Sequence, residues 1–223
     1  MNPTRRSGRV VGILLFLQLA GLMVPFILLM PAVTANFLTD AAARASLVRT
    51  AVLLLFANGA LTIWISIRTS DALRARHYAW AVWLVATSVS WFVLQSVDNA
   101  LLMTMLSLSE GRAADTELLN AIGTAVRGIR RWTHYTELLA IDIWFFAFYG
   151  ALFRSSLIPR VLSGFGLAMV FVHAAAIPLA TFIGYRTMPS LGVSLAVSHL
   201  AVATWLVVKG FAEREIGVPN HLG

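Results

Sequence analysis

The chain has 223 residues, of which 59% are hydrophobic and 12% charged, whereas a soluble domain is about 45–50% apolar and about 25% charged. This composition argues against a water-soluble globular protein and predicts one membrane domain that uses the whole length. The absence of cysteine excludes disulfides, thiolate metal sites and cysteine nucleophiles. The formal charge of +7 is spread over short segments between apolar runs, so we expect membrane lipids as partners and no nucleic acid.

Six apolar segments are long enough to cross a hydrocarbon core of about 30 Å, which takes about 20 helical residues. They are residues 10–33, 47–67, 79–106, 134–154, 161–184 and 190–211. The sequence therefore predicts an all-α, polytopic membrane helix bundle of about six transmembrane helices. Residues 1–9 form a basic N-terminus and residues 212–223 a C-terminal tail. The oligomeric state is left open.

Basic residues in the connections predict the orientation, because cytoplasmic loops carry an excess of Lys and Arg. One side of the membrane has ten of them: Arg5, Arg6, Arg9, Arg68, Arg74, Arg76, Arg154, Arg160, Lys209 and Arg214. The other side has seven, most of them in one long loop whose charges count less: Arg44, Arg49, Arg112, Arg127, Arg130, Arg131 and Arg186. We therefore expect both termini in the cytoplasm and the chain in the inner (plasma) membrane.

The first 35 residues also fit a cleaved signal peptide. Three arginines precede the apolar run, and Val33 and Ala35 fit a small-residue cleavage site. The apolar stretch is, however, about twice the usual 7 to 15 residues of such a peptide. We expect this segment to be kept as a membrane anchor.

The long connection, residues 107–133, has an amphipathic pattern over residues 115–132. Apolar residues recur there at helical spacing: Leu118, Leu119, Ile122, Val126, Ile129 and Trp132. Arginines occupy other faces, so the segment predicts a helix lying on the outer membrane surface. A lid over a pocket is the alternative interpretation.

Ionisable side chains inside a bilayer are costly and are therefore candidates for function. The candidate catalytic residues are Asp98, Glu137, Asp142, His173 and His199. The candidate substrate-binding residues are Trp91, Gln95, His134 and Trp144. Counting about 1.5 Å per residue places Asp142 and the last two histidines near the midplane, and Asp98 and Glu137 nearer the outer leaflet.

Helical spacing adds information about which of these side chains share a face. Trp91, Gln95 and Asp98 lie on one stripe of the third span. Glu137 and Asp142 are about 140° apart around the fourth, so they cannot both point into one narrow site.

Each candidate also has a structural interpretation. Asp98 can pair with Arg127 or Arg130, and Glu137 with His134 or Arg131. Histidines alone on apolar faces commonly form hydrogen bonds between helices.

Three segments are distinctive: the opening Met-Asn-Pro followed by arginines, the stretch from Phe153 to Ser163 with Gly164 and Gly166, and the closing segment 205–211. This order of residues resembles a bacterial membrane family known as domain of unknown function 4386. It implies a membrane protein and no activity. The position six before the Trp of the closing motif is typically Glu in that family, and here it is His199.

These residues favour a membrane enzyme without cofactor that performs acid–base chemistry, such as a cyclisation or an isomerisation, on a lipophilic, isoprenoid- or lipid-like molecule. Trp91 and Trp144 would form the wall of its pocket. A proton-coupled transporter or binding protein is the alternative, and a non-catalytic membrane assembly subunit is a third. Two histidines at matched depth would also permit haem or a metal, but no spaced ligand motif occurs and we expect no metal site.

Overall fold

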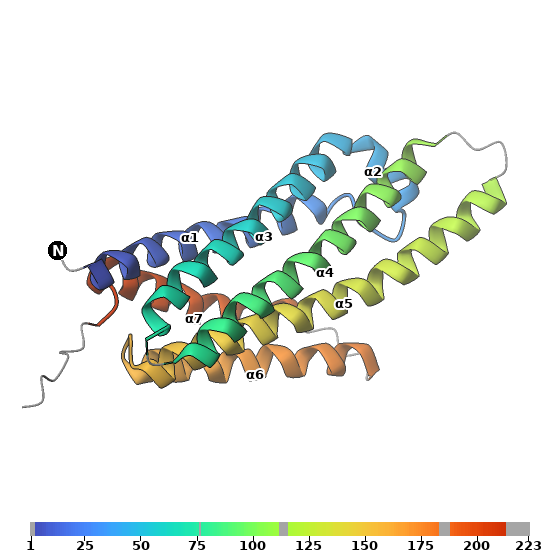
Figure 1. Cartoon of the computed structure of the whole chain (residues 1–223). Helices are drawn as coiled ribbons and strands as arrows, with labels where there is room; N and C mark the ends of the chain where they lie inside the picture. Colours follow the sequence, from blue (N-terminus) through green and yellow to red (C-terminus); the bar gives the residue numbers. More distant parts are fainter. Residues whose placement is uncertain (1–2, 76, 112–115, 183–187, 213–223) are drawn as a thin grey trace, which may run out of the picture.

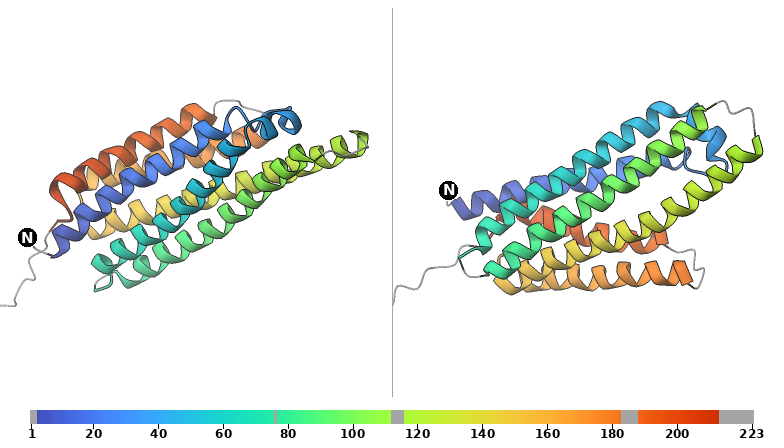
Figure 2. Two further views of the ribbon diagram at one scale, coloured as in Figure 1. Left: turned by 90° about the horizontal axis from the view of Figure 1, so that it is seen from above. Right: turned by 45° about the vertical axis from the view of Figure 1, so that its right-hand side comes forward.

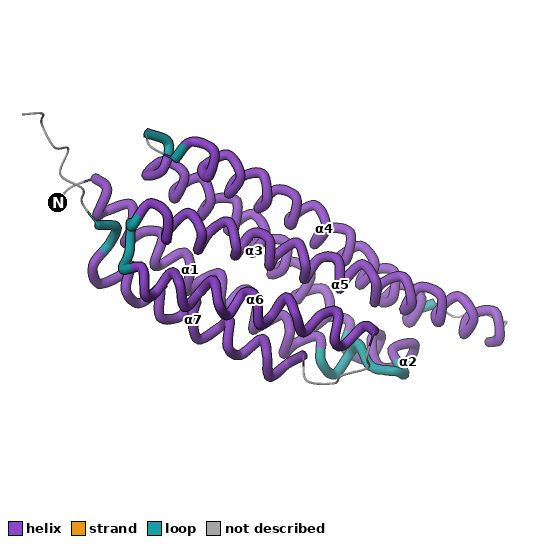
Figure 3. The backbone as a smooth tube through the Cα atoms, turned by 90° about the horizontal axis from the view of Figure 1, so that it is seen from below, coloured by secondary structure: helices purple, strands orange, loops and turns teal. Residues whose placement is uncertain are grey.

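The computed structural model describes residues 3–75, 77–111, 116–182 and 188–212, with the backbone alone at residues 180–181 and 188–192. These ranges form seven helices: α1 (Pro3–Leu29), α2 (Phe37–Ala43), α3 (Ala45–Leu73), α4 (Tyr78–Glu110), α5 (Thr116–Ser155), α6 (Arg160–Phe182) and α7 (Met188–Lys209). Figure 1 shows the six longer helices side by side as one bundle. Figure 3 shows that helices, joined by short connections, make up nearly all of the described chain.

The bundle has an apolar exterior and a partly polar interior, the reverse of a soluble protein. Five helices of the described chain are long and apolar enough to cross a membrane: α1, α3, α4, α5 and α6. The described part of α7 adds a shorter apolar helix, Val193–Lys209. Large apolar side chains such as Ile27, Leu53 and Phe171 are exposed, whereas Gln18 and Asn58 are buried. Lipid is the solvent that such a surface needs, and the prediction of a polytopic helix bundle is confirmed.

The transmembrane helices are arranged in a closed ring. Each of them packs against its neighbour in the chain, from α1 to α3, α4, α5, α6 and α7, and α7 returns to pack against α1. The two views in Figure 2 show α7 beside α1. The start of α1 and the end of α7 therefore lie at the same end of the bundle.

Two glycines on α1 allow this ring to close. Gly8 and Gly12 are four residues apart, as in the small-residue motifs that let membrane helices approach closely. A Cβ added at Gly8 would clash with the backbone nitrogen of Phe211, and one at Gly12 would lie 2.7 Å from that of Val207. The two backbones are thus in direct contact over one turn of α1.

Arginines from α1 complete the junction by capping α7. Arg5 Nε donates a hydrogen bond to the carbonyl oxygen of Lys209 at 2.9 Å, and Arg9 Nη2 donates to that of Val208 at 3.1 Å. The last carbonyls of a helix have no partner within the helix and carry its negative partial charge. Two cationic side chains at this point therefore stabilise both the end of α7 and its contact with α1.

The structure corrects the expectation for residues 115–132. Residue 115 lies outside the described residues, and residues 116–132 belong to the same helix as the fourth span, α5 (Thr116–Ser155). The expected break around residue 133 is absent because no proline interrupts the helix. Thr133 and Thr136 donate their hydroxyl hydrogens to the carbonyl oxygens of Ile129 and Trp132 within it.

A short helix that the sequence did not predict, α2 (Phe37–Ala43), contacts this part of α5. The tip of α2 reaches α5 at Gly123, where an added Cβ would lie 3.2 Å from Leu38 Cδ1. In addition, Arg127 Nη1 donates a hydrogen bond to the carbonyl oxygen of Ala35 at 2.9 Å. The amphipathic segment is therefore tied to the rest of the bundle.

The α1–α7 contact predicts a sharp difference between two glycine-to-alanine substitutions. Gly12→Ala forces a methyl group against the backbone of α7 and should cost about 1–3 kcal/mol of stability, as overpacking usually does. Gly128→Ala is the matched control, because nothing lies within 4 Å of a Cβ added there. Alanine has a higher helix propensity than glycine, so this variant should be as stable as the wild type or more stable. Thermal unfolding in detergent micelles measures both. Equal melting temperatures for the two variants would contradict the close contact.

Candidate active site

Several charged and polar side chains meet between α4 and α5, two helices that run antiparallel. Trp91, Gln95 and Asp98 form the expected buried stripe on α4. Three side chains of α5 meet this stripe: Arg130, His134 and Glu137. Because residues three and four apart share a face of a helix, the α5 residues lie one above the other along the contact.

His134 lies between two carboxylates. Its Nδ1 atom is 3.3 Å from Glu137 Oε2 and 3.6 Å from Asp98 Oδ2. Both carboxylates are buried, whereas 41% of the His134 side chain is exposed. Nδ1 itself is buried, so the exposed part of the ring lies on the side away from the carboxylates.

Each carboxylate has a second partner that holds it in place. Trp91 Nε1 donates a hydrogen bond of 2.7 Å to Glu137 Oε1. Arg130 Nη2 donates one of 3.2 Å to Asp98 Oδ2, with both side chains largely buried. A buried carboxylate is costly unless it is paired and hydrogen-bonded, and these contacts give each carboxylate one hydrogen-bonded oxygen.

A pocket of about 290 Å³ opens beside His134. Its walls come from the connection between α1 and α2, from Met105 of α4 and from one face of α5. The α5 residues in its lining are Arg127, Arg130, Arg131, His134 and Tyr135. The exposed histidine therefore has an open space in front of it and fixed carboxylates behind it, which is the arrangement needed to exchange a proton with a bound molecule.

Two expected substrate-binding residues lie elsewhere. Gln95 Oε1 is turned toward α3, where it would be 2.7 Å from a Cβ added at Gly59. Trp144 donates a hydrogen bond of 2.8 Å to Ser66 Oγ and stacks on Phe148 with ring centroids 5.4 Å apart. Trp144 is thus a packing residue between α3 and α5.

The other ionisable candidates form two separate pairs along α5. Asp142 Oδ1 lies 2.7 Å from His173 Nδ1 of α6. His199 Nδ1 of α7 lies 3.3 Å from the hydroxyl of Tyr149. Glu137 faces α4 while Asp142 faces α6, as the angle of about 140° between them predicts. The five expected catalytic residues therefore occupy three places.

Two partners in these contacts had little or no signal in the sequence. Tyr149 was not among the candidates, because a tyrosine inside an apolar span looks like any other packing aromatic. Arg130 was one of two possible partners for Asp98, and the pairing with it is confirmed. Its position four residues before His134 is the signal that places it on the same face as the site.

Among the described residues, no group of three His, Asp or Glu side chains has an arrangement that would hold a metal ion. The apolar surface and the ring of long helices define the class of protein: a multi-pass helical membrane protein. The family described as Domain of unknown function (DUF4386) matches residues 10–210, and the chain belongs to this family. No curated protein and no solved structure matches the chain.

The buried ion pair between Asp98 and Arg130 predicts a non-additive response to mutation. Arg130→Met leaves the carboxylate without its cation, and breaking one half of a buried pair typically costs about 3–5 kcal/mol. Adding Asp98→Asn removes the orphaned charge, so the double variant should regain most of that loss. Chemical unfolding in micelles of the two single variants and the double variant gives the coupling energy. Additive losses would mean that the pair contributes no mutual stabilisation.

Proposed function

We propose that this protein is a membrane-embedded acid–base enzyme that isomerises a lipophilic molecule, with His134 as the group that transfers the proton. The observation that carries the proposal is the position of His134, whose exposed edge reaches a pocket while its Nδ1 faces Glu137 and Asp98. A carboxylate beside one ring nitrogen orients a histidine and stabilises the imidazolium, so that the other nitrogen acts as a base.

The proposed reaction moves one proton and needs no other reactant. His134 Nε2 takes a proton from a carbon atom that a neighbouring carbonyl activates, and the C–H electron pair enters the conjugated system. The same nitrogen then returns the proton to a different carbon, which shifts a double bond. Asp98 and Glu137 stabilise the imidazolium between the two steps. Substrate and product have the same atoms and the same oxidation state.

The site favours isomerisation over the other reaction type, a cyclisation started by acid. Protonating a plain carbon–carbon double bond needs a strong acid and aromatic faces around the resulting cation. Trp91 instead uses its indole N–H to hold Glu137, and Trp144 packs between α3 and α5. A histidine flanked by carboxylates accepts a proton readily, but it is too weak an acid to protonate such a double bond.

One observation favours a second function, proton-coupled transport. The three polar contacts follow α5 from one end toward the other: His134 with Glu137, then Asp142 with His173, then Tyr149 with His199. A rise of about 1.5 Å per residue separates successive contacts by about 8–10 Å. A proton carried along this row would pass through His173, whereas the enzyme has no use for it, so His173 distinguishes the two functions.

We also propose that the protein lies in the plasma membrane of a bacterium with both termini in the cytoplasm. The support is the excess of basic residues at the end of the bundle where α1 begins and α7 ends. Arg76 and Arg214, counted toward that excess, lie outside the described residues, as do Arg112 and Arg186 of the opposite side.

Deuterium exchange tests the enzyme without knowledge of the substrate. We expect purified protein, incubated in D₂O with the lipid extract of the cells that make it, to introduce deuterium into a lipid-soluble species detected by mass spectrometry. His134→Gln should slow this exchange by about 100-fold or more, since general base catalysis contributes about 10²–10⁴-fold. Glu137→Gln should slow it less, because Trp91 still holds the side chain.

His173→Gln is the matched control, because it alters a histidine paired with a carboxylate outside the site. It should leave the exchange unchanged. The enzyme proposal fails if no species is labelled faster by the wild type than by the His134 variant. The transporter would instead be established by two results together. Neither the wild type nor any variant shows deuterium exchange, and the His173 variant loses a proton-driven uptake of solute into liposomes that the wild type has.

The absence of cysteine makes the topology easy to test with single-cysteine variants. Arg74→Cys and Gly111→Cys place a thiol at opposite ends of the bundle, at exposed positions just after α3 and α4. In spheroplasts, a membrane-impermeant maleimide should label position 111 and should label position 74 only after lysis. The reverse pattern would overturn the proposed orientation.

A further inference from the structure

The pocket in front of His134 has an unusual charge for a membrane-embedded site. Its lining includes three arginines and one histidine, and none of its nine lining residues is acidic. Arg127, Arg130, Arg131 and His134 follow the spacing i, i+3, i+4 and i+7, so they form one continuous face of α5. We propose that this pocket binds the anionic head, a phosphate or carboxylate, of an amphiphilic molecule.

Each arginine makes a contact that occupies at most one of its hydrogen-bond donors. Arg127 donates Nη1–H to Ala35, Arg130 donates Nη2–H to Asp98, and the Arg131 guanidinium lies 5.8 Å from the centroid of the Tyr135 ring. A guanidinium has five N–H donors. Donors fixed in advance but still available bind an oxyanion with little loss of side-chain entropy.

The carboxylates around the pocket do not cancel its charge. Asp98 and Glu137 lie behind His134, and Asp98 accepts from Arg130. Asp40, the nearest acid on α2, accepts from Thr34 at 2.5 Å and lies 3.7 Å from Arg44, which offsets it. Three arginines against two carboxylates leave a positive excess even with His134 neutral, and a positively charged concave site attracts anions.

The surroundings of the pocket are suited to a molecule with an apolar tail. The pocket's own lining includes the apolar residues Val33, Ala35 and Met105, and Met30, three residues before Val33, is a large exposed apolar side chain. An apolar chain packed beside them avoids water or replaces a lipid. A small hydrophilic anion would gain nothing from this surface, which favours an amphiphile over a free ion.

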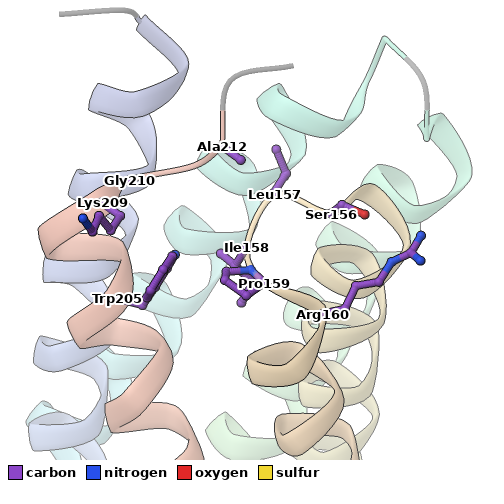
Figure 4. A pocket seen from close by; sticks show the side chains of 9 residues that line it. All are labelled: Ser156, Leu157, Ile158, Pro159, Arg160, Trp205, Lys209, Gly210 and Ala212. Carbon is purple, nitrogen blue, oxygen red and sulfur yellow. The ribbon is translucent and has the colours of Figure 1, made fainter. Parts of the chain in front are cut away.

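A second pocket, at the other end of the bundle, also contains cationic side chains but arranges them differently. It has a volume of about 530 Å³ and also includes two cations, Arg160 and Lys209. Figure 4 shows these side chains on opposite sides of that pocket and extending away from each other. Their charges do not converge, whereas four basic groups of α5 line the smaller pocket from a single face.

The inference rests on the proposed function only in naming the substrate class, because the same pocket would bring an anionic head close to His134. The substrate is then a lipophilic molecule whose reacting carbon lies a few bonds from a phosphate or carboxylate. The anionic group positions that carbon against the base, and positioning of this kind contributes strongly to catalysis.

Isothermal titration calorimetry on the full chain in neutral detergent micelles tests the pocket with three probes. We expect dodecyl phosphate to bind, inorganic phosphate to bind at least about 100-fold more weakly for lack of a tail, and dodecyltrimethylammonium not to bind. Arg127→Gln and Arg131→Gln should each weaken dodecyl phosphate binding about tenfold, the effect of one charge-assisted hydrogen bond.

Arg160→Gln is the matched control, since this arginine lies 5.7 Å from the ring centroid of Phe153, much as Arg131 lies over Tyr135. It should leave dodecyl phosphate binding unchanged. Equal losses in the Arg131 and Arg160 variants, or binding of the cationic probe, would overturn the inference. Inorganic phosphate binding as tightly as dodecyl phosphate would overturn the amphiphile assignment.

The deuterium exchange and the calorimetry separate the two proposals. Exchange that depends on His134, without arginine-dependent phosphate binding, would leave the enzyme and remove the anion pocket. Arginine-dependent binding without exchange would leave the pocket and remove the enzyme.

Discussion

Ionisable side chains inside a lipid-facing bundle need partners on neighbouring helices when their own helix supplies none, and much of this structure follows from that constraint. In this chain α5 satisfies it, because its polar side chains contact three different helices in turn. His134 and Glu137 face α4, Asp142 faces α6, and Tyr149 faces α7. These contacts hold α5 against α4, α6 and α7. Moving any of these residues by one position would rotate its polar group by about 100° around the helix and away from its partner.

The ring itself depends on a different physical principle, the close approach of small residues. The contact between α1 and α7 relies on Gly8 and Gly12 and on arginines that cap α7. Lipid provides no hydrophobic force between helices, so close packing and hydrogen bonds must supply the affinity. The bundle thus uses packing where the ring closes and polar pairing around α5.

Sequence patterns predicted the polytopic helix bundle because long apolar runs have few alternatives in a membrane protein. They predicted the stripe from Trp91 to Asp98 because helical periodicity is local. They failed to join residues 116–132 to the fourth span, since arginines in an amphipathic pattern look the same on a surface helix and on a long helix that extends past the bundle. The estimated depth in the membrane grouped Asp142, His173 and His199. The direction in which each side chain points separates His199 from the other two.

The position of His199 bears on how much the site can vary among relatives. The resemblance to the family suggests a glutamate where this chain has His199, and the structure places that residue against Tyr149 and Phe145. The contacts of His134 with Asp98 and Glu137 come from α4 and α5 alone. A change at position 199 therefore alters the α5–α7 contact and does not remove a partner from His134. The contacts of His134 with Asp98 and Glu137 do not involve position 199, which makes His199 a poor guide to the candidate site around His134.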